Sequence, residues 1–232
     1  FRDIVTGCGN TINYQPSRPK SESDFQKVFL NGSKGYLLNV NRVNLPPSTE
    51  DQKRAAWGDF SGYPSTTGVY IRSDAGGGNG GIYIHGNAGI TMSVDAGGNQ
   101  IMTVVQGTDT TVIKFDMAAG TTSVLSGSVG PGSPTSAASM SNGVIYCSGN
   151  ITSLRGTIAD NWVANGEIQR RSAWTIATDT NAGKDITITG DLVYATRPDK
   201  SQPLDAPCNL AAGTLGIVAQ DIKIADDGTP YY

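Results

Sequence analysis

The residues best suited to bind a ligand combine tryptophans with arginines over one short stretch of the chain. A tryptophan ring stacks on a nucleobase or a sugar, and a neighbouring guanidinium group supplies positive charge. The alternative is that Trp174 is a core residue, because tryptophan is usually largely buried. The candidate ligand patch consists of Arg155, Trp162, Arg170, Arg171 and Trp174.

The sequence gives little support for catalysis. His85 is the only histidine, and no Gly-x-Ser-x-Gly nucleophile motif accompanies it. We therefore expect His85 at the surface or at a corner of the fold, and we expect no enzyme.

Aspartates are the residues that a β-helix polysaccharide lyase would use together with calcium. Calcium takes several oxygen ligands, so the carboxylates must cluster. Asp226 and Asp227 are adjacent, but the others occur at predicted corners, where aspartate bonds to the local backbone. We expect neither a metal nor a cofactor. The other aspartates of this kind are Asp160, Asp179, Asp185, Asp191 and Asp221.

The three cysteines are Cys8, Cys147 and Cys208, so at least one is not paired with another cysteine of this chain. There is no Cys-x-x-Cys motif, and a zinc site is not expected. Cys147 falls in a predicted strand and Cys208 in a loop of the same region. A Cys147–Cys208 disulfide would suit an oxidising compartment, and the alternative is that Cys147 is a small buried hydrophobe.

The composition is typical of an extracellular β protein with many tight turns. The 232 residues include 30 glycines, and charged residues make up only 16%. No apolar run approaches the ~20 residues of a membrane helix, and the net charge of −3 disfavours a nucleic-acid coat. We expect the chain outside the cell or on its surface, reaching a membrane only through a segment before Phe1. A local basic strip would have to come from Arg155, Arg170, Arg171, Lys184, Arg197 and Lys200.

Four segments repeat one pattern, in which an apolar strand, a corner of small residues and a second apolar strand follow one another. Stacked coils of this kind form a β-solenoid. The sequence therefore predicts an all-β fold, a parallel β-helix-like β-solenoid with an antiparallel hairpin region and a small N-terminal α/β element. The four segments are residues 80–92, 143–154, 185–194 and 215–224.

The predicted organisation has four parts. Residues 1–66 form an irregular segment with short helices, and residues 67–126 form the hairpin region joined to the solenoid. Residues 127–141 form a linker loop rich in glycine, serine and proline, and residues 142–232 form the solenoid coils.

Shorter elements are predicted within these parts from local signals. Helical spacing predicts a helix over 22–30, and an apolar run predicts a strand over 35–43. A second helix is predicted over 51–57, with Ser48 as its N-cap and Gly58 ending it. Glycine-rich turns at 95–99 and 107–110 predict hairpins.

Several segments resemble a bacterial family of unknown function found in PilX-like proteins linked to type IV pilus assembly. The resemblance spans roughly residues 43–224 and includes Gly80-Gly-Ile-Tyr-Ile-His-Gly86, Gly143-Val-Ile-Tyr146, Asp185-Ile-Thr-Ile-Thr-Gly-Asp191 and Leu215-Gly-Ile-Val-Ala-Gln220. It implies a surface-exposed solenoid domain similar to those of solenoid-bearing minor pilins. In such proteins a hydrophobic N-terminal helix lies in the pilus shaft, and this chain departs from the pattern by not including that helix. The family offers no catalytic residues to carry over.

These features together predict a non-enzymatic structural or adhesive protein, a subunit or tip component of a pilus-like filament. We expect it to associate with other copies of itself or with other pilus subunits, by strand pairing at terminal coils or by an extended terminal segment that enters a neighbour. The alternative is a DNA- or glycan-binding domain at a pilus tip, and a β-helix polysaccharide lyase is the third hypothesis. No soluble small-molecule substrate is expected.

Overall fold

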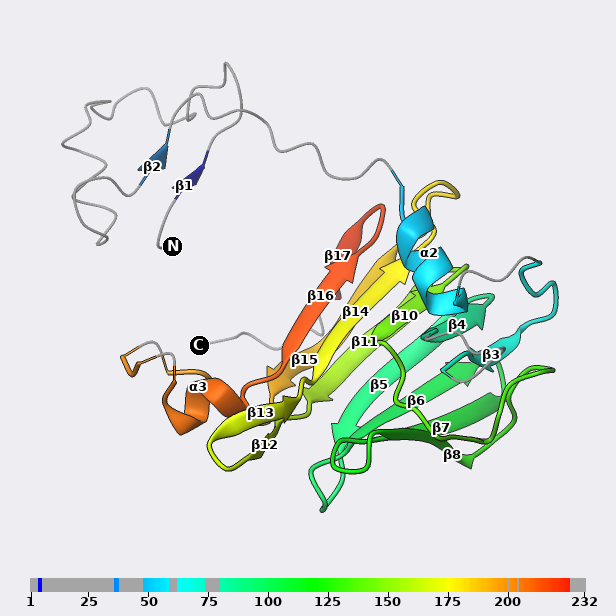
Figure 1. The fold of residues 1–232 in the computed structure, drawn as a ribbon. Helices are drawn as coiled ribbons and strands as arrows, with labels where there is room; N and C mark the ends of the chain where they lie inside the picture. The colour runs from blue at the N-terminus through cyan, green and yellow to red at the C-terminus, as the bar shows by residue number, and fades with distance from the viewer. Residues whose placement is uncertain are drawn as a thin grey trace, which may run out of the picture. The chain divides into compact units, whose positions relative to one another are not determined.

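The computed structural model describes residues 4–5, 36–37, 48–58, 62–73, 80–199, 201–203 and 205–225 (Figure 1). The chain divides into two compact units, Phe1–Pro47 and Ser48–Tyr232.

The described part of the first unit is a parallel pair of two-residue strands, β1 (Ile4–Val5) and β2 (Tyr36–Leu37). The helix predicted over 22–30 lies outside the described residues. The strand predicted over 35–43 is described only at β2.

The second unit consists mainly of β-strands in two large sheets, so the predicted all-β class is confirmed (Figure 1). The strand orders are β16-β14-β10-β4-β3 and β17-β15-β11-β5-β6-β7-β8-β9, and both sheets mix parallel with antiparallel pairs. The five-stranded sheet contains β3 (Gly68–Ile71), β4 (Ile82–His85), β10 (Val144–Cys147), β14 (Ala173–Thr178) and β16 (Thr214–Val218). The eight-stranded sheet contains β5 (Ala88–Val94), β6 (Gln100–Gln106), β7 (Asp109–Asp116), β8 (Thr121–Ser126), β9 (Ser136–Ala137), β11 (Ile151–Ile158), β15 (Ile186–Tyr194) and β17 (Ile222–Ile224). Outside these sheets the structure describes the helices α2 (Glu50–Trp57) and α3 (Pro207–Ala211) and the hairpin of β12 (Trp162–Ala164) and β13 (Glu167–Arg170).

Four times the chain runs through one strand of the five-stranded sheet and then through one strand of the eight-stranded sheet. The successive pairs are β4 with β5, β10 with β11, β14 with β15, and β16 with β17, and they have the same order in both sheets. Each pair lies parallel to the next one. Equivalent residues of successive pairs are therefore neighbours across the sheet.

The hydrophobic core joins side chains from both sheets. In the five-stranded sheet Ile82, Ile145 and Ile176 lie in register and are fully buried. In the eight-stranded sheet Ile90 and Leu154 are register partners and are also fully buried. Each such row of register partners, or ladder, places aliphatic side chains one above another. The core is therefore continuous from one strand pair to the next.

Three of the four predicted corners lie between the two sheets, but the predicted corner at Gly190 and Asp191 is wrong. β15 runs through these residues as one strand. Its register against β11 shifts at this point, so the extra residues form a bulge. Glycine within an apolar run marks a bulge as well as a turn, which explains the error.

Helix α2 confirms the helix predicted over 51–57, and Gly58 ends it with a φ of 79°, in the left-handed region. Ser48 is not its N-cap; that position is held by Thr49. The Thr49 hydroxyl makes no cap bond because it donates to the carbonyl of Thr178, at 2.6 Å. Trp57 packs on Tyr83, with ring centroids 5.3 Å apart, so α2 is held against the five-stranded sheet (Figure 1).

The segment predicted as a linker loop, residues 127–141, lies along the outer edges of both sheets. Gly130 donates its N–H to the carbonyl of Val69 on β3, at 2.7 Å, and the Ser133 hydroxyl accepts the N–H of Ile71, at 3.1 Å. Further along, β9 pairs with β8. This segment therefore covers the backbone groups at this end of the stack, as a cap does.

We expect truncation of an aliphatic side chain to alanine to lower the free energy of unfolding much more in the middle of a ladder than at its end. Leu154 is fully buried, whereas Ile224, at the end of the same ladder, is 79% exposed. We expect Leu154→Ala to lower the free energy of unfolding by about 2–5 kcal/mol, because it leaves a cavity. Ile224→Ala should cost less than about 1 kcal/mol. Urea denaturation at low protein concentration measures both values, and equal losses would contradict a core that ends at β17.

Candidate binding surfaces

Trp174 does not belong to a ligand patch. Its side chain is 2% exposed, and its ring lies 4.6 Å from that of Phe115, centroid to centroid. The indole N–H donates to the Ser172 hydroxyl at 2.9 Å, so the ring is buried with its polar group satisfied. Including Trp174 in the patch was wrong, and the alternative that it is a core residue is confirmed.

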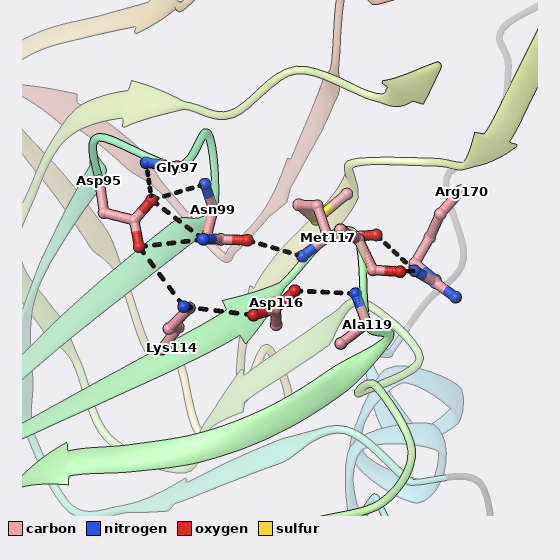
Figure 2. Close-up of polar contacts among 9 residues, drawn as sticks. Asp95, Gly97, Asn99, Lys114, Asp116, Met117, Ala119 and Arg170 are labelled. Atoms are coloured by element: carbon pink, nitrogen blue, oxygen red, sulfur yellow. Dashed lines mark hydrogen bonds and ion pairs between the residues drawn. The ribbon is translucent and has the colours of Figure 1, made fainter. Parts of the chain in front are cut away.

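Arg170 is bound to the protein itself. Its Nη1 donates to the carbonyl oxygens of Met117 and Ala118, in the turn after β7 (Figure 2). Gly120 makes room for this contact, since a Cβ atom there would lie 2.4 Å from Arg170 Nη2. Arg170 therefore fastens the β12–β13 hairpin to the β7–β8 turn.

The other patch residues lie on two separate elements. Trp162 is 40% exposed and faces Arg170 in the hairpin register, and Arg171 follows β13 in an exposed position. Arg155 lies on β11, where its Nε donates to the Thr91 hydroxyl at 3.4 Å. The hairpin thus brings three of the predicted residues together, while Arg155 belongs to the eight-stranded sheet.

A charged network joins two turns of the eight-stranded sheet beside Arg170 (Figure 2). Lys114 Nζ lies 3.2 Å from Asp116 Oδ2 and 3.7 Å from Asp95 Oδ2. Asn99 donates to the Asp95 carboxylate, and its own Oδ1 accepts the N–H of Met117, at 3.0 Å. The hairpin turn predicted at 95–99 is confirmed, and these bonds tie it to the β7–β8 turn.

Hydrogen bonds shift the pKa of both aspartates of this network downwards. For Asp116 the N–H of Ala119 is the largest cause, and Lys114 adds to it. For Asp95 the largest single effect is burial, which raises the pKa. The hydrogen bonds from Asn99 and the nearby backbone, together with Lys114, lower the pKa by more, so the net shift is downwards. Both carboxylates are therefore more easily ionised in the folded protein than in the unfolded chain.

Cys147 and Cys208 are free thiols, so the predicted disulfide is wrong. Cys147 lies fully buried in the core, where its Sγ donates to the carbonyl of Gly86, at 3.1 Å. Burial raises the pKa of its thiol to about 12. Cys208 lies in α3, on the connection between β15 and β16. The alternative that Cys147 is a small buried hydrophobe is confirmed.

His85 lies at the corner between β4 and β5. Its Nδ1 is 3.2 Å from the Ser148 hydroxyl, which also accepts the N–H of Gly86 at 3.0 Å. Within the described ranges no carboxylate bonds to His85. The histidine and the serine thus join the corners of two successive strand pairs.

The aspartates considered for calcium binding serve different local contacts. Asp160 accepts the N–H and the hydroxyl of Thr196, and Asp179 accepts the N–H of Ala182. Asp185 forms an ion pair with Lys223. Among the described residues no group of three His, Cys, Asp or Glu side chains could hold a metal ion. Asp226 and Asp227 lie outside the described residues.

A cavity of about 330 Å³ lies between β3, the β6–β7 turn and the segment after β8. Among the described residues its lining includes Thr67, Asp109, Thr110 and Ser128 and no lysine or arginine. Such a lining offers hydrogen bonds to a neutral molecule rich in hydroxyl groups, and no cation for a phosphate. Sequence reasoning missed this cavity, because its lining combines residues from three separate segments, around 66–70, 106–111 and 127–131. Glycan binding stays a prediction.

The C-terminal edge, formed by β16 and β17, is where the stacked core ends. Along one ladder Ile151 and Ile186 are fully buried, whereas Ile222 is 50% exposed. Along the next, Leu154 is fully buried and Ile224 is 79% exposed. Within the described part of the chain no strand pairs with the outer side of β16 or β17. As far as the described residues go, this edge therefore combines backbone groups that have no strand partner with exposed apolar side chains.

No protein-family model, no curated protein and no solved structure matches the chain. Among the described helices none is both long and apolar enough to cross a membrane.

The hydrogen bonds of Arg170 predict that substituting it destabilises the fold, whereas substituting the neighbouring Arg171 does not. Arg170→Met removes the donors to the two turn carbonyls, and we expect it to lower the free energy of unfolding by about 1.5–3 kcal/mol. Arg171→Met is the matched control, because Arg171 is exposed and makes no hydrogen bond among the described residues; it should change stability by less than about 0.5 kcal/mol. Urea denaturation gives both values. Equal effects would show that the carbonyl contacts add no stability.

The lowered pKa values predict a loss of stability in acid. Asp95 and Asp116 titrate below their ordinary value of 3.8 in the folded protein, so their contribution is complete above 3.8 and disappears as the pH falls through the lowered values. Asp116→Asn keeps an oxygen for the N–H of Ala119 but cannot titrate. We expect its unfolding free energy to fall less steeply in acid than that of the wild type. The control is Asp109→Asn, an exposed site on the same strand, and urea denaturation over a pH series measures all three proteins.

Proposed function

We propose that the protein is a non-enzymatic structural or adhesive domain of a bacterial pilus-like filament, located outside the cell. In this proposal it associates with copies of itself, or with other subunits, through its C-terminal edge. The observation that carries the proposal is the exposed end of the core at that edge.

The proposal includes a β-solenoid built from the four strand pairs. Support comes from their common order in the two sheets and from the parallel register of each pair with the next. In this interpretation β6 to β9, the β12–β13 hairpin and α3 are excursions between successive coils. A stack of coils is rigid and presents its connections on the outside, which suits display on a filament.

The pilus context is supported by the resemblance of residues 43–224 to pilus-associated proteins. It is compatible with surface side chains that tie one turn or hairpin of the protein to another, as Arg170 and the Asp95–Lys114–Asp116 network do. Such contacts keep loops in place without chemistry.

The edge supplies the physical drive for association. An unpaired strand offers a row of N–H and carbonyl groups to another strand, and proteins normally cover or charge such edges. Here Ile222 and Ile224 add apolar area that pairing would remove from water. Strand addition from another chain would satisfy both needs at once.

We expect Ile224→Lys to abolish self-association, because a lysine at the end of the core opposes burial of this edge. Val105→Lys is the matched control: Val105 is 41% exposed but lies on β6, which is paired on both sides. Sedimentation velocity over a concentration series measures association, and circular dichroism checks the fold. A wild-type protein that stays monomeric at all concentrations would overturn the proposed self-association, as would an Ile224→Lys variant that associates normally.

A further inference from the structure

We propose that the partner at the C-terminal edge is a second copy of this chain, and that the two copies close as a twofold dimer. β17 of one copy lies antiparallel to β17 of the other, with Ile222 opposite Ile222. This inference rests on the proposed function, since it specifies the self-association that the function requires.

The two ends of the stack differ, and this difference favours a closed dimer. At the other end the segment 127–141 bonds to the outer side of β3 through Gly130 and Ser133, and β9 covers β8. Head-to-tail stacking would need a long open strand at both ends, and at this end the eight-stranded sheet terminates in β9, which is only two residues long. A single self-complementary surface closes about a twofold axis, so pairing through this edge alone stops at a dimer, and a filament would have to use other surfaces of the protein as well.

The hydrogen bonds of β17 show which of its backbone groups are free. Ala225 donates its N–H to Ile188 on β15, and the carbonyl of Asp221 accepts the N–H of Ile186. Because alternate residues of a strand bond to opposite sides, Lys223 also faces β15. The backbones of Ile222 and Ile224 therefore face the open side, and Ile222 can exchange two hydrogen bonds with its equivalent in a second copy.

Charge selects the register of the antiparallel pair. With Ile222 at the twofold axis, Asp221 of each copy lies opposite Lys223 of the other. With Lys223 at the axis, the two lysines would face each other, which is unfavourable for directly opposed residues. Of these two registers, only the first makes the sequence Asp-Ile-Lys-Ile complementary to itself.

In this register the apolar side chains of β17 lie on one face of the sheet and its charged side chains lie on the other. Ile222 and Ile224 continue the ladders of Ile186 and Ile188, while Lys223 pairs with Asp185 on the opposite face. In the dimer each Lys223 would lie between Asp185 of its own chain and Asp221 of the second copy. The apolar face would join the two cores.

The test exchanges the two charges in separate full-length proteins. Asp221→Lys alone places like charges at both contacts of the twofold pair, and so does Lys223→Asp, so each should weaken dimerisation roughly tenfold or more. An equimolar mixture of the two variants restores opposite charges at both contacts and should dimerise like the wild type. Asp185→Asn is the control for the lost internal ion pair, and it should leave dimerisation within about threefold of the wild type. Sedimentation velocity of each protein and of the mixture gives these values.

A second measurement does not depend on charge. In a Cys8→Ser, Cys208→Ser background, Ile222→Cys should form a disulfide between copies under mild oxidation, because Cα atoms of such a pair are about 5.5 Å apart. Ile224→Cys would face Gln220 of the second copy, so it should cross-link far less.

The outcomes separate this inference from the proposed function. Oligomers that grow beyond dimers, or a mixture that fails to regain dimerisation, would overturn the twofold register while leaving self-association intact. A wild-type chain that is monomeric at every concentration would overturn both. If that monomer dimerises once residues 226–232 are removed, the edge is covered by the chain's own segment and the second copy is excluded as its occupant.

Discussion

The fold depends on the register in which successive strand pairs stack. Parallel pairing places Ile82, Ile145 and Ile176 above one another, and these aliphatic side chains pack into a core shared by both sheets. A shift by one residue would turn each strand's apolar side chains to the opposite face. Register therefore links backbone pairing to core packing.

Stacking in register also creates two ends, and the chain treats them differently. One end bonds to the segment 127–141, which supplies backbone and serine groups to β3. At the other end, the exposed fraction of the residue rises along one ladder from zero at Leu154 to 79% at Ile224. Among the described residues, a core that ends in this way leaves apolar area and hydrogen-bonding groups without a strand partner, which is why the proposed contact is placed at this edge.

Elements whose structure depends only on neighbouring residues could be predicted from local signals in the sequence. Gly58 ends α2, and the 95–99 turn forms because the Asp95 side chain bonds within four residues of itself. Gly190 was misassigned because a glycine in an apolar strand fits a corner or a bulge, and only pairing with β11 decides between them. The roles of Arg170 and Trp174 in the candidate ligand patch were mispredicted for a related reason, since their contacts come from distant parts of the chain. The acceptors of Arg170 are carbonyls more than fifty residues earlier in the chain, and the partner of Trp174 is Phe115 on another strand.

An open edge carries a risk of uncontrolled aggregation, and the composition of β17 bears on that risk. An edge strand with isoleucines alone would accept any extended chain. Asp221 and Lys223 alternate with the isoleucines, so a foreign strand or a shifted copy meets like or unpaired charges. In the proposed dimer the isoleucines would provide the drive for pairing, while the charges would favour a second copy in one register. The same four residues can in this way favour assembly and limit it.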